Sequence, residues 1–392
     1  MKQLPLIALV TALNYTGQCL AGQVAAAPIA DSATVKVKLQ HAEGHRIYFY
    51  RTDGQQMIRD SVYTEANGYR VYRLPAAEDR LQLMMVQDPY FKVDLSKGDV
   101  PPPQLQFYLK KGATITIEGN ALAPAAAMVS SDDPDVQLYE TYRKEQDLLQ
   151  IKAWMNTRTS GLLESVKDTA AVKALRKDWE KVFQDIDKYK RDFVFSHPGT
   201  RPALELFQQF YKRLDTVEAR QFFEQFPAEW KQSGTGKEIA AYFQSLNSTV
   251  AGQKLPLFRS MGIDGKMVDI ARLKDKVLIV DFWGSWCGPC RRSHPHLKAL
   301  YDQYKKKGLE IIGIAAEGPY EQSQPVWRKA VKEDGINWLQ VLNDPDKNDL
   351  VKAFAVTAFP TKFIVDRQGN IVLKLIGDEH EELDKTLAQL LP

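Results

Sequence analysis

One short stretch, residues 280–291 (VDFWGSWCGPCR), constrains the fold of this chain more than any other. Residues 276–280 read KVLIV, a continuous apolar and β-branched run that is typical of a strand buried on both faces. After Cys290, apolar residues recur three or four apart as far as Tyr304, which predicts a helix that ends at Gly308. The order strand, cysteine pair, helix predicts an α/β domain around a central sheet.

The position of the two cysteines has chemical consequences. Cys287 comes just before the first helical turn, where unpaired N–H groups and the helix dipole favour a thiolate over a thiol, so we predict that it is the nucleophile. Gly288 and Pro289 let the chain turn into the helix. Cys290 follows one turn later, close enough to form a disulfide. Arg291 adds a positive charge whose effect on the thiol is secondary if it points to solvent.

The segment 281–291 resembles the active-site segment of the thioredoxin superfamily, and more narrowly that of TlpA/ResA-like envelope thiol-disulfide oxidoreductases. Pro295 matches the proline that kinks the active-site helix, and residues 359–361 (FPT) match the cis-proline loop that faces the cysteines. The strand and turn after that loop match as well. The resemblance covers residues 255–392 and implies a C-terminal thioredoxin-like fold, a mixed central sheet flanked by helices, with the extra helix of the TlpA-like group within residues 317–338.

The resemblance also implies roles for individual residues. Asp281, six residues before Cys287, matches the buried carboxylate that accepts the proton of the second cysteine. Burial on an apolar strand favours the protonated form, so Asp281 can exchange a proton near neutral pH; a plain capping role is the alternative. Trp283 and Trp286 are expected to shield the site. The residues expected to contact substrate are Phe359, which is bulkier than usual for its position, Pro360, Trp286, Gly288 and Pro289.

The predicted function is therefore a cell-envelope thiol-disulfide oxidoreductase that reduces protein disulfides without a cofactor. Reduction, rather than oxidation, is favoured by Gly288-Pro289, the dipeptide shared with reducing thioredoxins, and a membrane thiol donor would supply electrons. Cytochrome c maturation is a common task of the resembled family and enters only as an analogy.

Two alternatives remain open from the sequence. Cys287, Cys290 and His294 have spacings that could bind copper(I) or zinc, although a closed zinc site needs four ligands and we expect no metal. We expect His294 and His296 to be solvent-facing residues of the helix. In the other alternative, the N-terminal regions bind a partner protein, and the redox domain serves only to dock that partner.

The remainder of the 392 residues predicts two or three domains. Residues 1–27 read as a signal peptide, which predicts export to the periplasm or cell envelope. Lipidation at Cys19 is the alternative, and membrane contact is expected only in that case. Without the leader, the cysteine pair contains the only cysteines.

Between the leader and the redox domain, two regions differ in pattern. Residues 33–125 alternate in polarity and predict a small antiparallel β-sandwich, whereas residues 132–250 are amphipathic and predict a helical domain with three or four helices. Residues 255–392 form the predicted redox domain. The net charge of +3 is small and dispersed, so we expect no nucleic-acid partner.

Overall fold

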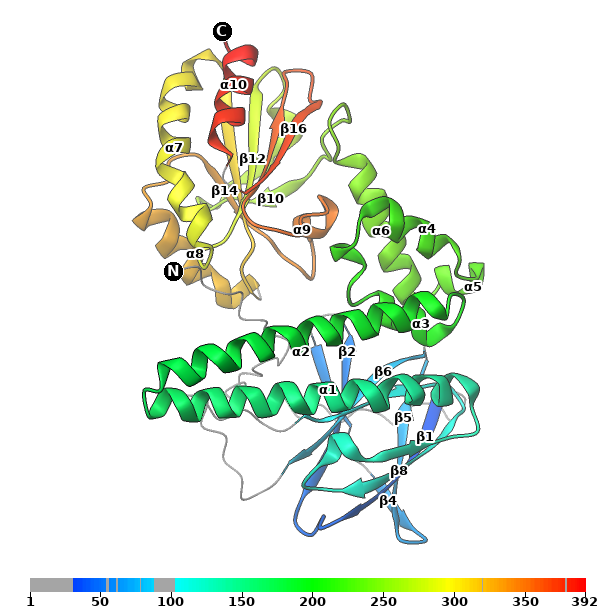
Figure 1. Ribbon diagram of the computed structural model, residues 1–392. Coiled ribbons are helices and arrows are strands. Elements are labelled where there is room, and N and C mark those ends of the chain that lie inside the picture. Colours follow the sequence, from blue (N-terminus) through cyan, green and yellow to red (C-terminus); the bar gives the residue numbers. More distant parts are fainter. Residues whose placement is uncertain are drawn as a thin grey trace. The chain divides into compact units, whose positions relative to one another are not determined.

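The computed structural model describes residues 31–53, 56–60, 63–77, 79–87, 103–318, 320–377 and 379–392. The predicted signal peptide, with Cys19, lies outside these residues. The chain divides into two compact units, Met1–Leu206 and Phe207–Pro392 (Figure 1).

The first unit contains two sheets, of strand order β4-β5-β1-β8-β9 and β3-β2-β6-β7. Phe49 of the second sheet packs edge-to-face on Tyr72 of the first, with ring centroids 4.8 Å apart, and both rings are buried. The strands are β1 (Ser32–Gln40), β2 (Arg46–Asp53), β3 (Gln56–Asp60), β4 (Tyr63–Ala66), β5 (Tyr69–Pro75), β6 (Arg80–Gln87), β7 (Leu105–Leu109), β8 (Thr114–Asn120) and β9 (Met128–Ser130).

The predicted β-rich region is confirmed, but its description as antiparallel is wrong at one pair of strands. β1 and β8 run parallel, with Val35 opposite Ile115. A hairpin between β1 and β8 would have made them antiparallel, but no hairpin joins them. The chain instead reaches β8 from β7, a strand of the other sheet.

Two long helices follow in the first unit, α1 (Pro134–Ser165) and α2 (Thr169–Ser196), which pack against each other (Figure 1). α1 is fastened to the β-rich part by Arg143, which is 3% exposed and donates to the carbonyls of Ala125 and Ala127 at 2.9 and 2.7 Å. Arg143 also pairs with Glu140 and Asp147 on its own helix. These contacts join α1 to the β-rich part of the first unit.

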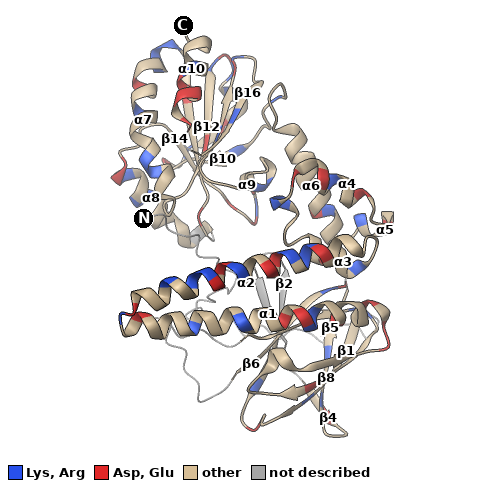
Figure 2. Cartoon of the chain, in the orientation of Figure 1, with Lys and Arg blue, Asp and Glu red and all other residues tan. Residues whose placement is uncertain are grey.

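Charges of both signs are mixed along α2 in the view of Figure 2. Three helices begin with a side-chain cap: the side chains of Asp168, Asp215 and Ser233 accept backbone N–H bonds at the beginnings of α2, α4 and α6. The shorter helices are α3 (Arg201–Phe207), α4 (Thr216–Glu224), α5 (Ala228–Lys231) and α6 (Gly234–Ser248).

The second unit contains the predicted mixed sheet, in the order β14-β13-β12-β15-β16. Its central strand β12 is parallel to β13 and antiparallel to β15, and all seven of its residues are buried. The strands are β12 (Val277–Trp283), β13 (Leu309–Ala315), β14 (Leu339–Leu342), β15 (Thr361–Val365) and β16 (Ile371–Ile376), beside a small hairpin of β10 (Arg259–Met261) and β11 (Met267–Asp269).

Helices cover this sheet on both faces. Ile279 of β12 packs with Leu297 of α7 (Gly288–Tyr304) and Leu387 of α10 (His380–Leu390), and Figure 1 shows these two helices on one face. Phe282 belongs to the opposite face, where it contacts Phe354 at a centroid distance of 5.2 Å. The extra helix predicted from the TlpA-like resemblance is α8 (Tyr320–Glu333), and a short α9 (Leu350–Ala353) precedes β15.

Candidate active site

The two cysteines lie where the central strand ends and the helix α7 begins. Cys287 is the N-cap residue of α7, and its sulfur accepts a hydrogen bond from the backbone N–H of Cys290 at 3.2 Å. The pair forms a disulfide with Cα atoms 5.3 Å apart. In the reduced form, the same N–H group and the helix dipole would favour a thiolate at Cys287.

The two sulfurs differ in access. Cys290 is fully buried and Cys287 is 4% exposed. The residues that adjoin Cys287 in the chain, Trp286 and Gly288, are exposed, and so is Pro289. The surface around the disulfide therefore opens on the Cys287 side.

An aromatic pair and a proline loop border this opening. The bond Phe359–Pro360 is cis, as predicted from the resemblance. Phe359 packs against the buried cluster that includes both cysteines, and its ring lies 5.4 Å from that of Trp286. Trp286 is 61% exposed, whereas Trp283 is fully buried. Of the two tryptophans, only Trp283 is therefore placed to shield the cysteine pair from solvent on its buried side. The predicted substrate-contact residues thus lie together beside the disulfide.

The loop that carries Trp286 is held by the segment after β13. Glu317 accepts from the backbone N–H of Ser285 at 2.6 Å and from its hydroxyl at 2.8 Å, and the indole N–H of Trp286 donates to the carbonyl of Ala316 at 2.8 Å. Gly284 permits this arrangement, since a Cβ there would lie 2.6 Å from the Trp286 ring nitrogen. Glu317 was not assigned a role from the sequence, because its partner is 32 residues away.

Asp281 occupies the middle of β12 and is 1% exposed. Its cross-strand neighbour is Lys362 of β15, whose ammonium nitrogen lies 3.4 Å from the Asp281 carboxylate and which is itself 4% exposed. Asp281 is therefore fully buried rather than half-buried, and it is paired with Lys362. Lys362 was missed in the sequence, although a lysine inside the apolar strand TKFIV is a signal for a buried ion pair.

Arg291 does not point freely toward the cysteines. Its guanidinium bonds to Asp334, with the shortest contact at 2.6 Å, and to Glu333 at 2.9 Å. These bonds to Asp334 and Glu333 raise the pKa of Arg291. Burial alone would raise the pKa of Asp334, but hydrogen bonds from Arg291 and His294 outweigh it, so the Asp334 pKa lies below its usual value. The predicted effect of Arg291 on the Cys287 thiol is accordingly balanced by two carboxylates.

The expectation that both histidines face solvent is wrong for His294. This residue is 1% exposed, its Nδ1 lies 2.7 Å from Asp334, and its ring packs edge-on against Trp283. His294 lies on the buried face of α7, one turn after Cys290 and one turn before Leu297. His296 is partly exposed and lies 2.7 Å from Asp384.

Within the described ranges, no three His, Cys, Asp or Glu side chains come together in a way that would hold a metal ion. His294, the third ligand in the metal alternative, is bonded to Asp334 through Nδ1. None of the described helices combines the length and the apolar character needed to cross a membrane.

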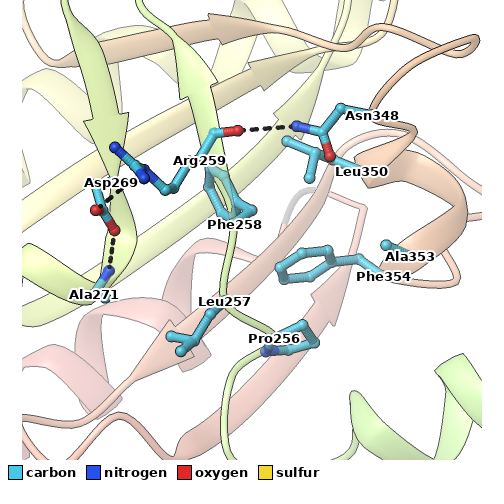
Figure 3. A pocket seen from close by; sticks show the side chains of 10 residues that line it. All are labelled: Pro256, Leu257, Phe258, Arg259, Asp269, Ala271, Asn348, Leu350, Ala353 and Phe354. Atoms are coloured by element: carbon cyan, nitrogen blue, oxygen red, sulfur yellow. Dashed lines mark hydrogen bonds and ion pairs between the residues drawn. The ribbon is translucent and has the colours of Figure 1, made fainter.

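A hollow of about 550 Å³ lies elsewhere in the second unit (Figure 3). Phe258 and Phe354 form its apolar wall, and Arg259 pairs with Asp269 at its edge, 3.3 Å apart. Neither cysteine lines it, and it is not the candidate active site.

Part of this chain is similar to known proteins. A family model described as Redoxin matches residues 250–391. The thiol-disulfide oxidoreductase ResA of a Bacillus cereus strain is 29% identical over 38% of this chain and 84% of its own length, and ResA of Bacillus subtilis (strain 168) is 29% identical over 36% and 76%. The crystal structure of the thioredoxin domain of a thiol-disulfide oxidoreductase from Bacteroides vulgatus is 30% identical, over 36% of this chain and 99% of that one, with a TM-score of 0.33.

The sheet order, the disulfide at the start of α7 and these relatives define the class: the protein is an oxidoreductase enzyme of the thioredoxin superfamily that acts through a thiol-disulfide pair. Within that superfamily, its residues 250–391 are similar to ResA-type thiol-disulfide oxidoreductases.

Proposed function

We propose that this protein is a disulfide reductase of the cell envelope and that it exchanges thiols with protein disulfides through Cys287 and Cys290. The observation that carries the proposal is the position of the disulfide, at a helix N-terminus and open on the Cys287 side. The apolar rim of Trp286 and Phe359 and the backbone at Pro360 would receive an extended segment of the substrate.

The reaction proceeds in two steps. The Cys287 thiolate attacks one sulfur of the substrate disulfide, that bond breaks, and the other substrate sulfur leaves as a thiolate that takes a proton from water. Cys290 then gives its proton to Asp281 and attacks the Cys287 sulfur. The mixed disulfide breaks, the second substrate sulfur leaves with its electron pair, and the protein ends with the Cys287–Cys290 disulfide. Two electrons pass to the substrate.

Substitution of each cysteine tests the assignment. Cys287→Ser should abolish insulin disulfide reduction by the full-length protein. Cys290→Ser should leave the first attack intact and accumulate mixed disulfides, and the double variant is the control for nonspecific capture. Trapping by Cys287→Ser instead, or equal alkylation rates of both thiols in the reduced protein at pH 6, would contradict the assigned roles.

Direction needs a separate measurement, because the same atoms serve oxidation and reduction. Potentials in this superfamily run from about −270 mV for thioredoxin to about −120 mV for DsbA, a gap of roughly 7 kcal/mol. The Gly288-Pro289 dipeptide favours the reducing end. Equilibration with glutathione and dithiothreitol buffers should give a value below about −200 mV, and a value well above it would identify an oxidase or isomerase.

Location and electron supply complete the proposal. The leader-like residues 1–27 support export, and the chain would then need a thiol donor in the membrane to return it to the dithiol form after each turnover. Fractionation of cells that express the full chain tests the location, and retention in the cytoplasm would refute it.

A further inference from the structure

Lys362 is a buried cation that the two exchange steps do not use. It lies on β15, two residues after Pro360, and its Cα is in register with that of Asp281 on β12. The side chains are 4% and 1% exposed, with Nζ and Oδ1 3.4 Å apart. Lysine is almost never buried to this extent unless it is paired with an opposite charge.

A second contact connects Lys362 to the helix of the cysteines. Its Nζ lies 3.4 Å from the hydroxyl of Ser293, which is 1% exposed and donates to the carbonyl of Cys290 at 2.8 Å. One ammonium group therefore contacts the strand that carries Asp281 and the helical turn that carries Cys290. The proline loop enters the same strand just before Lys362.

The charges that surround Asp281 can be named element by element. The alternation along β12 turns Asp281 to the face that α7 covers, and β15 contributes Lys362. Its neighbour on β13 is Gly313, which has no side chain. On the facing turns of α7 the titratable residues are Cys290 and His294, and the latter is bonded to Asp334. Among the described residues, Lys362 is the cation that forms an ion pair with Asp281.

We propose that Lys362 is a positioning residue for the second exchange step: it holds the Asp281 carboxylate ionised and in place until that carboxylate takes the proton of Cys290. The inference rests on the proposed function and deepens it. The Cys290 S–H bond breaks, Asp281 gains the proton, and the Cys290 thiolate displaces the substrate sulfur from Cys287. Without the ammonium group, the buried Asp281 carboxylate would have no cation beside it to offset the cost of burying its charge.

The test uses the reduced full-length protein and 5,5′-dithiobis(2-nitrobenzoate). The first release of the coloured thiolate reports attack by Cys287, and the second reports attack by Cys290. In Lys362→Met the pH profile of the second phase should move up by about one to three pH units, because the charge pair is lost. Lys362→Arg should restore the wild-type profile. The matched control is Lys374→Met, a partly buried lysine of β16 that stacks on Phe363, and its profile should not move.

A double variant separates positioning from a structural role. If Lys362 acts through Asp281, Lys362→Met should change the second phase less than twofold in an Asp281→Asn background. A profile that stays in place, or one that moves equally in that background, overturns the inference, as does a uniform loss of rate at every pH. Lys362→Gln serves as the test if circular dichroism shows that Lys362→Met is unfolded. A missing first phase in the wild-type protein would instead refute the proposed function.

Discussion

Asp334 ties the start of α7 to the end of α8, and its removal should be costly. One oxygen accepts from Arg291 at 2.6 Å, and the other lies 2.7 Å from Nδ1 of His294. Asp334→Asn keeps the shape but removes the charge. Hydrogen bonds to charged groups contribute about 1.5–3 kcal/mol, and the side chain is only 12% exposed, so we expect a loss of about that size.

Urea unfolding followed by tryptophan fluorescence measures this loss, since Trp283 and Trp338 both pack on His294. At slopes of roughly 1–3 kcal/mol per molar, a loss of about 2 kcal/mol moves the midpoint by roughly 1 M. Glu333→Gln is the matched control, because Glu333 is 47% exposed and bonds the same arginine, and its loss should stay below about 1 kcal/mol.

The pH dependence of the same difference gives the sharper test. The pKa of Asp334 is lowered in the folded protein, so its contribution is complete above the ordinary carboxyl value of 3.8 and disappears as the pH falls through the folded value. The wild-type protein and Asp334→Asn should therefore differ fully at pH 7, and the difference should shrink only as the pH falls below 3.8. Equal losses for the Asp334 and Glu333 variants, or a difference that does not change with pH, would refute the reasoning.

Two further outcomes are expected. Gly284→Ala should lower the catalytic efficiency toward protein disulfides without unfolding the chain, because a Cβ would lie 2.6 Å from the ring of Trp286 and 3.0 Å from the carbonyl of Ala316. Unchanged kinetics and unchanged tryptophan fluorescence would contradict the role given to the loop that carries Trp286. In the first unit, burial raises the pKa of Asp147 to about 6 although Arg143 opposes it. A carboxyl with a raised pKa adds stability below pH 3.8 that is lost as the pH rises through about 6. In Asp147→Asn, the urea midpoint should therefore depend less on pH between pH 4 and 7 than it does in the wild-type protein. An unchanged pH dependence would contradict the raised pKa of Asp147.

Much of the redox domain was predictable because its signals are local. The strands β13 and β16 can be recognised in the sequence, since each is an apolar run between turn residues. The helix caps were equally predictable, because a cap is a contact within three residues. The β-rich region was found, but β3, β4, β7 and β9 were not, since short strands depend on their partners rather than on their own pattern.

The sequence by itself determined the active-site stretch: a buried strand, a cysteine pair, a helix start and a proline loop further on. The strand follows from a run of apolar residues, the helix start from its capping residues, and the cysteine pair and the proline loop from residue type. All of these signals act over a few residues. Only the tertiary structure decided which charges meet. Lys362 reaches Asp281 across 81 positions, Asp334 binds Arg291 across 43, and the sign and partner of such contacts depend on strand register and helix packing rather than on neighbours in the chain.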